Sequence, residues 1–520
     1  MSLDAHLIVL PILLPLAAGA LTLVLDEGRQ TLKAAISVVA ALLLVVIAGA
    51  LVRVADESFA TVYRIGEWPA PYGIVLVLDR VSAILVLLTS VLGVTSLVFS
   101  LARWHRAGPR FHSLVQFLLM GVNGAFLTGD LFNLFVFFEV LLAASYGLAL
   151  HGSGEERVKA SLHYIVVNLV ASLLFLVGVS LIYGATGTLN MADLALRWRE
   201  AAPPDRALFE AGTAILGVAF LVKAAMWPLC FWLPAAYSTA SPPAAALFAV
   251  LTKVGIYAVL RTGLLFAAEA QAAPSTGTPW LAYGGLATIA FGTLGVLASQ
   301  DLGRLASCSV LVSSGTLLAA IAIGSTPLTG AALYYLVVST LALSALFLLV
   351  ELVDRDRGPV ANLLAVTAEA FRTTDADEEG AEVGRVIPAA TAVLGLSFGA
   401  CAVMLAGLPP LAGFLGKFAM LDALLEPNPV PMASWAMVAL LVTSGFATII
   451  GMARAGVRRF WAVSEDNAPR VSVLEIAPVL VLLALCAVLT VGAGSLIGYL
   501  DAGAQALHAP GGYVDRVLFP

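Results

Sequence analysis

Stretches of about twenty apolar residues recur from one end of this chain to the other, and they limit the folds open to it. A helix needs roughly 20 such residues to cross the hydrocarbon core of a bilayer. Of the 520 residues, 60% are hydrophobic and only 12% are charged, whereas roughly 25% of the residues of a soluble domain are charged. The sequence therefore predicts an all-α polytopic membrane protein with the lipid bilayer around it.

Windows of this length predict about fourteen transmembrane helices. The first runs near 4–25, the third near 75–102 and the last near 471–500. We interpret the first as a spanning helix and not as a cleavable signal peptide, because its apolar run is long enough to cross the membrane.

Two windows are too long for one straight span, and both contain proline. The window 207–237 holds FLVKAAMWPL with Pro228, and the window 388–426 holds GLPPLAGFLGKFAM with Pro409 and Pro410. Proline removes a helical hydrogen bond, and non-helical backbone is tolerated at membrane depth only beside protein or a wet cavity. We therefore predict two broken helices, whose freed backbone groups can hold water or orient an ion.

The basic residues outside the predicted helices set an orientation. Sixteen lysine and arginine residues follow odd-numbered helices, and seven follow even-numbered ones. Cytoplasmic loops carry the excess of basic residues. The odd-numbered loops, including the long polar loop 354–387, should therefore be cytoplasmic, and both termini should lie outside.

Three of the five lysines lie inside apolar segments, namely Lys223, Lys253 and Lys417. A charge at the bilayer centre costs roughly 2.5–3.5 kcal/mol on insertion scales. The chain also has 22 arginines. Arginine stays protonated in proteins, whereas a buried lysine can release its proton. The choice of lysine inside the membrane predicts reversible protonation. The alternative is that these side chains extend to the interface.

Glu139 is the carboxylate that lies well inside a predicted span, in the stretch DLFNLFVFFEVLLAASYG. It is expected to pair with Lys223, since an unpaired buried carboxylate would stay neutral. Such pairs mark ion pathways in membranes more often than purely structural salt bridges, which is the alternative here. His163 is a possible proton relay near the inner end of its helix, and a role as an interfacial histidine is equally open.

Other residues give weaker or negative signals. Asp79 and Arg80, which adjoin at the start of the third helix, are interpreted as an interfacial anchor. The four cysteines lie in apolar runs without metal-ligand spacing, so they are expected to be buried small side chains. We expect no metal and no other cofactor, and the slightly acidic balance gives no sign of a nucleic-acid partner.

Two long motifs carry a family resemblance. FWLPAAYSTASPPAAALFAVLTKVGIYAVLR, residues 231–261, resembles the signature of the antiporter-like subunits shared by respiratory complex I and the Mrp-type multisubunit cation/proton antiporters. SQDLGRLASCSVLVSSG, residues 299–315, is similar to the next signature, although Gly303 stands where complex I subunits usually have lysine. Within the family, GDLFNLFVFFEVLLAASYG most resembles the D-type subunits of Mrp antiporters.

The resemblance implies an organisation of the chain. Helices 1–3 would occupy residues 1–110, and helices 4–8 and 9–13 would form two inverted five-helix repeats at 111–265 and 266–460. Helix 14 and the tail would occupy 461–520. By motif, the family's proton-translocating residues correspond to Glu139, Lys223, Lys253 and Lys417.

Residues and resemblance together predict a proton-translocating subunit of a multisubunit Na⁺/H⁺ antiporter in a bacterial cytoplasmic membrane, with the other subunits as partners. Lys223 would carry the proton under the control of Glu139, Lys253 would connect two half-channels, and Lys417 would exchange with the far exit. One alternative is a proton-pumping subunit of complex I or of a membrane-bound hydrogenase. Another is a scaffold subunit that transports nothing.

Overall fold

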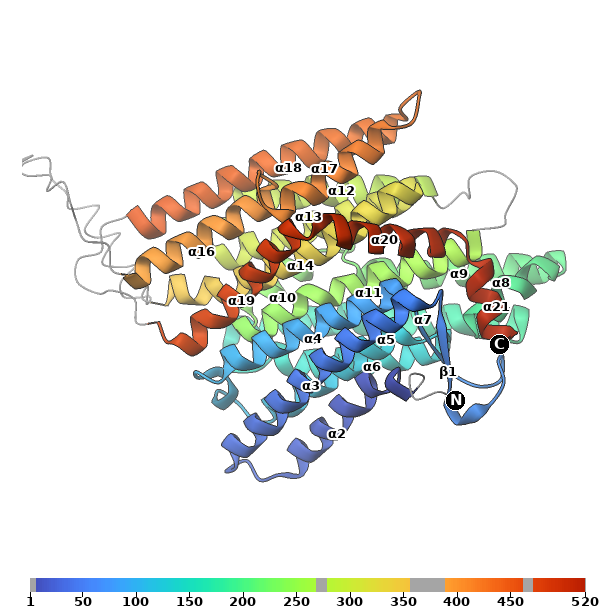
Figure 1. The fold of residues 1–520 in the computed structure, drawn as a ribbon, viewed down its shortest axis with the longest axis horizontal. Helices are drawn as coiled ribbons and strands as arrows, with labels where there is room; N and C mark the ends of the chain where they lie inside the picture. The colour runs from blue at the N-terminus through green and yellow to red at the C-terminus, as the bar shows by residue number, and fades with distance from the viewer. Residues whose placement is uncertain (1–5, 268–277, 356–388, 462–470, 520) are drawn as a thin grey trace, which may run out of the picture.

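The computed structural model describes residues 6–267, 278–355, 389–461 and 471–519. The long helices run along the same axis, and β1 (Thr61–Arg64), α8 (Met191–Glu200) and α21 (Gly511–Leu518) gather at one end (Figure 1). We call this the strand end. The opposite end, which holds Arg103, Arg355 and Arg459, is called the arginine end.

Helices account for most of the described chain. In the first half they are α2 (Leu10–Val24), α3 (Gln30–Glu57), α4 (Arg80–Ser100), α5 (Phe111–Leu127), α6 (Leu131–Ala149), α7 (Glu155–Thr186), α8, α9 (Pro203–Lys223), α10 (Leu233–Thr239) and α11 (Pro242–Ala267). In the second half they are α12 (Thr278–Ala298), α13 (Leu302–Ile323), α14 (Thr326–Asp354), α16 (Ala389–Ala406), α17 (Ala412–Leu425), α18 (Met432–Gly456), α19 (Val473–Val491), α20 (Ala493–His508) and α21. Short 3₁₀ turns lie at Ile65–Glu67 and Trp104–Arg106, and a π turn lies at Val457–Trp461.

Eleven helices of the described chain are long and apolar enough to cross a membrane. Two further apolar helices, α2 and α5, are shorter. The polytopic, mainly helical architecture is therefore confirmed, while the number of fourteen spans stays a prediction. The loop predicted at 354–387 lies almost entirely outside the described residues.

The third predicted helix is too long at its start. Residues 75–78 form β2 (Val75–Leu78), which pairs antiparallel with β1, so the fold contains a two-stranded sheet beside its helices. The helix begins only at Arg80, because the Asp79 carboxylate accepts a hydrogen bond from the Ser82 amide and the Ser82 hydroxyl accepts one from the Asp79 amide. This reciprocal cap fixes the start of α4.

The last predicted span, near 471–500, is also wrong in its extent. α19 ends at Val491, and after Gly492 the chain continues in α20, which takes a different direction (Figure 1). Two glycines flank Ala493 at this point, and glycine is a poor helix former. α20 packs on α4, α11 and α14.

Both long windows are interrupted at the predicted prolines. α9 ends at Lys223 and α10 begins at Leu233, with Pro228 in between. α16 ends at Ala406 and α17 begins at Ala412, with Pro409 and Pro410 in between. α11, α13 and α14 occupy the centre of the bundle between these two breaks, since most of their side chains are buried. All four cysteines are buried and free, as expected.

Candidate functional site

Lys223 is the last residue of α9, where the first broken helix opens. Its side chain is only 4% exposed, so the ammonium group does not extend to the surface of the bundle. The Nζ atom donates a hydrogen bond of 3.2 Å to the Ser172 hydroxyl on α7. It also lies 4.9 Å from the centre of the Phe138 ring on α6, within the range of a cation–π contact. Three helices therefore converge on this ammonium group.

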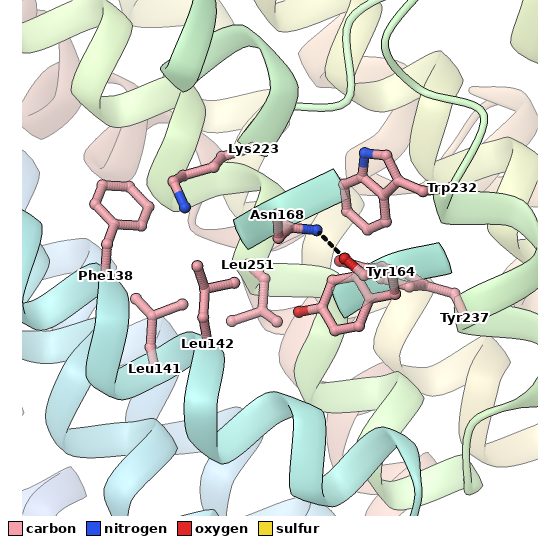
Figure 2. Close-up of a pocket in the computed structure, with 9 residues that line it drawn as sticks. All are labelled: Phe138, Leu141, Leu142, Tyr164, Asn168, Lys223, Trp232, Tyr237 and Leu251. Carbon is pink, nitrogen blue, oxygen red and sulfur yellow. Dashed lines mark hydrogen bonds between the residues drawn. The ribbon is translucent and has the colours of Figure 1, made fainter. Parts of the chain in front are cut away.

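A small cavity, about large enough for one water molecule, lies in front of Lys223 (Figure 2). Its lining residues come from α6, α7, α9, the first break, α10 and α11, and they are Phe138, Leu141, Leu142, Tyr164, Asn168, Lys223, Trp232, Tyr237 and Leu251. Two buried polar atoms of this lining, the Trp232 Nε1 and the Tyr237 hydroxyl, have no hydrogen-bond partner. Buried polar groups of this kind are usually satisfied by ordered water. The cavity is therefore suited to hold water beside the lysine.

A hydrogen-bonded pair of hydroxyl groups lies beside the cavity. The Tyr164 hydroxyl is 2.7 Å from the Ser145 hydroxyl of α6. The Asn168 amide donates to the Tyr164 backbone oxygen at 3.0 Å, as the dashed line in Figure 2 shows. The Ser145–Tyr164 contact thus joins helices α6 and α7 beside the cavity.

Glu139 follows Phe138 on α6 and is partly buried. Its Oε1 atom is buried and lacks a hydrogen-bond partner. Glu139 interacts electrostatically with Lys223, but in the described part of the chain no direct ion pair joins them, because the ammonium group is turned to Ser172. The pair predicted from the sequence therefore acts at a distance in this conformation.

Lys253 lies in the middle of α11 and is fully buried. Its Nζ atom donates to the Ser313 hydroxyl of α13 at 2.9 Å. Ser313 in turn is 3.0 Å from the Ser339 hydroxyl of α14. A lysine and two serines thus connect the three central helices through one line of polar atoms.

Gly255 brings the helices of the first two lysines together. A Cβ atom at this position would lie 2.7 Å from the Ala224 amide nitrogen and 2.9 Å from the Lys223 carbonyl carbon. No real side chain could occupy that space without moving backbone. The glycine therefore allows α11 to pack directly on the end of α9, two residues after Lys253.

Lys417 lies in the second turn of α17, just after the second break. Its Nζ atom donates to the backbone oxygens of Leu405 at 3.1 Å and Ala406 at 2.9 Å, at the end of α16. Free carbonyl groups at a helix C-terminus attract a cation. Gly407, with φ +76°, turns the chain here, and a Cβ atom on it would lie 2.5 Å from the Lys417 Cδ. The Lys417 side chain therefore bridges the break between α16 and α17.

In the described chain, His163 has no hydrogen bond to Glu139, Lys223, Lys253 or Lys417. Its side chain is exposed on α7, and its Nδ1 atom lies 3.0 Å from the Lys159 backbone oxygen one turn earlier. The tests proposed below therefore concern Glu139 and the three lysines first.

The structure also corrects the interpretation of Asp79. This carboxylate is buried and forms an ion pair with Arg261 of α11, whereas Arg80 pairs with Asp56 near the surface. The two neighbours therefore do not act as one interfacial anchor, because they point to different partners. Asp79 and Arg261 are 182 residues apart in the sequence. No local sequence pattern could therefore predict that they form an ion pair.

A group of ion pairs at the arginine end was also missed. Glu351 at the end of α14 pairs with Arg103 and Arg355, and Arg355 pairs with Glu475 of α19. The Trp104 indole donates to Glu351. These contacts tie the segment after α4 to α14 and α19, and their only sequence signal is the density of arginine outside the apolar segments.

The chain is similar to known proteins over most of its length. The family described as NADH:quinone oxidoreductase/Mrp antiporter, TM matches residues 128–448. This range includes Glu139, Lys223, Lys253 and Lys417. The D-type subunit of a probable K⁺/H⁺ antiporter from Rhizobium meliloti is 56% identical, over 99% of this chain and 97% of its own length.

A more distant relative and a solved structure extend the likeness over the whole chain. The D-type subunit of a Na⁺/H⁺ antiporter from Alkalihalophilus pseudofirmus is 35% identical over 99% of both chains. A chain in the structure of the Mrp complex from Dietzia sp. superposes with a TM-score of 0.83 at 27% identity, and the match covers 100% of both chains.

Proposed function

Because the chain belongs to the NADH:quinone oxidoreductase/Mrp antiporter transmembrane family, we propose that it is the D-type, proton-translocating subunit of a multisubunit monovalent cation/proton antiporter. The D-type relatives match it along almost its full length, which supports this assignment. Its partners would be the other subunits of that complex, in the cytoplasmic membrane of a bacterium, with both termini outside.

The observation that carries the proposal is the position of Lys223. Its ammonium group lies beside a mainly apolar cavity whose wall includes Tyr164, Asn168 and Tyr237, and it makes no ion pair with Glu139 in the described chain. Lys223 can have two states, which differ in the distance between its ammonium group and the Glu139 carboxylate. When Glu139 draws close, the paired ammonium group retains its proton. When Glu139 withdraws, the desolvated lysine is free to pass the proton on through cavity water.

Lys253 and Lys417 would continue the path. The packing of Gly255 on the end of α9 brings Lys253 near the first lysine. The Ser313 and Ser339 hydroxyls lead from Lys253 across α13 to α14, and α14 packs on α17, which carries Lys417. The two five-helix segments predicted to be inverted repeats would each contribute one broken helix to this line.

The transported cation is proposed from the relatives. The sequence resemblance suggested Na⁺, and the 35% identical relative is named for Na⁺, but the 56% identical relative is named for K⁺. We therefore expect K⁺ to drive proton exchange at least as well as Na⁺. Assays should use both ions.

The test is the variant Lys223→Ala in the assembled complex, with Lys159→Ala as a matched control, because Lys159 is an exposed lysine near the start of α7. Proton exchange is followed with a pH-sensitive dye in inverted membrane vesicles after addition of K⁺ or Na⁺. Lys223→Ala should abolish exchange, while Lys159→Ala should retain it. Wild-type rates for Lys223→Ala at equal complex abundance would sink the mechanism.

A redox-driven pump is the second candidate, because the family also includes NADH:quinone oxidoreductase subunits. The local chemistry of Glu139 and the lysines would be nearly the same, and the energy source would differ. Purification of the intact complex distinguishes the two. Co-purifying iron–sulfur or flavin subunits would favour the pump, and small membrane subunits alone would favour the antiporter.

A further inference from the structure

Helix α11 carries polar residues beyond Lys253, in the direction of the strand end. Tyr257 and Arg261 follow the lysine at intervals of four residues, so all three lie on one side of the helix. At 1.5 Å per residue, Arg261 is about 12 Å from Lys253 along the axis. This stripe leads from the middle of the bundle to its end, and the steps proposed above for Glu139, Lys223 and Lys417 do not use it.

Arg261 is held by several buried partners. It forms an ion pair with Asp79 at the start of α4. Its Nε and Nη2 atoms donate to the Tyr257 hydroxyl at 3.2 and 2.9 Å, and that hydroxyl donates to the Phe126 backbone oxygen on α5 at 2.9 Å. Arg261 is only 8% exposed. An arginine this deeply buried needs such partners, because desolvating an unpaired charge is costly.

The C-terminal segment covers this cluster. The Arg261 guanidinium carbon lies over two tyrosine rings, 5.3 Å from the centre of each. One ring belongs to Tyr513 of α21 and the other to Tyr257. α20 packs on α11, and in Figure 1 the dark red α20 runs toward the strand end, where α21 lies. Tyr513 therefore joins the chain's last helix to the polar stripe of α11.

A small cavity, about large enough for one water molecule, remains between α11 and the C-terminal helices. It is lined by Arg261, Leu265, Ala506, Leu507, Pro510 and Tyr513. A guanidinium group and a phenol in its wall give a water molecule the polar partners that it needs in a buried site.

We infer that this cavity is the strand-end mouth of the proton path, through which water reaches Lys253 along the Tyr257–Arg261 face of α11. Arg261 and Asp79 are positioning residues: their pair keeps the mouth narrow, and Tyr513 covers it. Protons pass by exchange along hydrogen-bonded water, so no covalent bond other than N–H and O–H changes. The inference rests on the proposed function and adds the place where the path meets water.

The test uses a cysteine in the cavity wall of the intact complex. Ala506→Cys is treated in whole cells with a charged, membrane-impermeant thiosulfonate, and proton exchange is then measured in inverted vesicles prepared from those cells. Gln505→Cys is the matched control, because the neighbouring Gln505 side chain is exposed on the same helix. The unmodified chain gives the background from the four buried native cysteines.

Modification of the introduced cysteine should lower the proton exchange rate of the Ala506→Cys complex at least tenfold. A reducing agent should restore the rate. Gln505→Cys should react and stay active. Modification of Ala506→Cys without loss of exchange would overturn the inference, and so would failure of the reagent to reach it. Leu265→Cys, on the α11 wall, replaces Ala506→Cys if the latter does not assemble.

The outcome is separable from that of the proposed function. If Lys223→Ala abolishes exchange while modified Ala506→Cys remains active, the lysine path stands and its mouth lies elsewhere. If Lys223→Ala retains exchange, the proposed function itself fails. Tyr513→Ala tests the cover separately: removing this side chain should speed the modification of Ala506→Cys several-fold in the folded complex.

Discussion

Each of the three lysines inside the apolar segments, Lys223, Lys253 and Lys417, is bound by neutral oxygen atoms. Lys223 and Lys253 donate to serine hydroxyls, and Lys417 donates to two backbone carbonyls. An ammonium group and a neutral amine can both donate to such an oxygen. The contacts can therefore persist while the proton comes and goes, which a direct bond to a carboxylate would not favour.

Glu139 offers a clean test at the residue scale. Its Oε1 atom has no hydrogen-bond partner, so Glu139→Gln removes the charge without breaking a bond of that atom that stabilises the fold. We expect proton exchange to fall by about a hundredfold or more, with an unchanged melting temperature of the purified complex. A large drop in melting temperature would assign the carboxylate to the fold instead.

The sequence was informative about isolated charges and silent about distant pairs. Glu139 and the lysines stand out because each interrupts an apolar run. Ser313, which binds Lys253, looks like any other small polar residue of a membrane helix. Asp79 and Arg261 carry clear charges, but only the packing of α4 on α11 brings them together.

At the scale of the helix, the two breaks depend on glycine as much as on proline. Pro228 and the pair Pro409–Pro410 lie in the interruptions, and the prolines were visible in the sequence. The close approach of neighbouring helices to each break was not. Gly255 packs on the end of α9, and Gly445 of α18 leaves only 2.8 Å between a Cβ position and the Ala406 backbone oxygen at the end of α16.

Two glycines of α11 form a matched pair for a second prediction. Gly255→Ala places a methyl group against backbone of the first break, which should cost roughly 1–3 kcal/mol and reduce proton exchange. Gly263→Ala on the same helix meets nothing within 4 Å and should be neutral or stabilising. Melting temperatures and exchange rates of the two variants check this. Equal behaviour would contradict the close packing at Gly255.

Short elements were the main failure of the sequence prediction at this scale. β2 has the sequence VLVL, which continues an apolar run and cannot be told from helix by its period alone. α20 was merged with α19, since the run of apolar residues continues through the bend at Gly492. In both places the chain stays apolar while its backbone changes.

Across the whole molecule, polar groups gather at both ends of the bundle and along the line between the breaks. The arginine end holds the Glu351 ion pairs and three buried histidines, of which His105 and His151 lie outside the apolar helices and His112 lies at the start of α5, against His105. The His151 Nε2 atom lies 2.7 Å from the Trp104 backbone oxygen. This contact ties the 3₁₀ turn after α4 to the end of α6.

This arrangement predicts a pH-dependent stability. Burial lowers the pKa of His105 and that of His151 below the usual 6.5. The unfolded chain therefore binds these protons more readily than the folded chain does. Stability from the neutral histidines is complete above about pH 6.5 and is lost as the pH falls below it.

The melting temperature of the purified complex should accordingly drop between about pH 7 and about pH 5. Replacing both histidines with glutamine should make that drop smaller. An equally steep decline in the double variant would place the acid sensitivity in other groups.

The central claim is that Glu139 and the three lysines form one proton path, and flux through the purified complex in liposomes tests it most directly. Proton uptake is recorded with an internal pH dye under an imposed K⁺ or Na⁺ gradient. Lys223→Ala, Lys253→Ala and Lys417→Ala are each compared with Lys159→Ala. The account predicts that each buried-lysine variant loses proton flux at least tenfold while Lys159→Ala matches the unmodified complex. Full flux in any one of these three variants would contradict it.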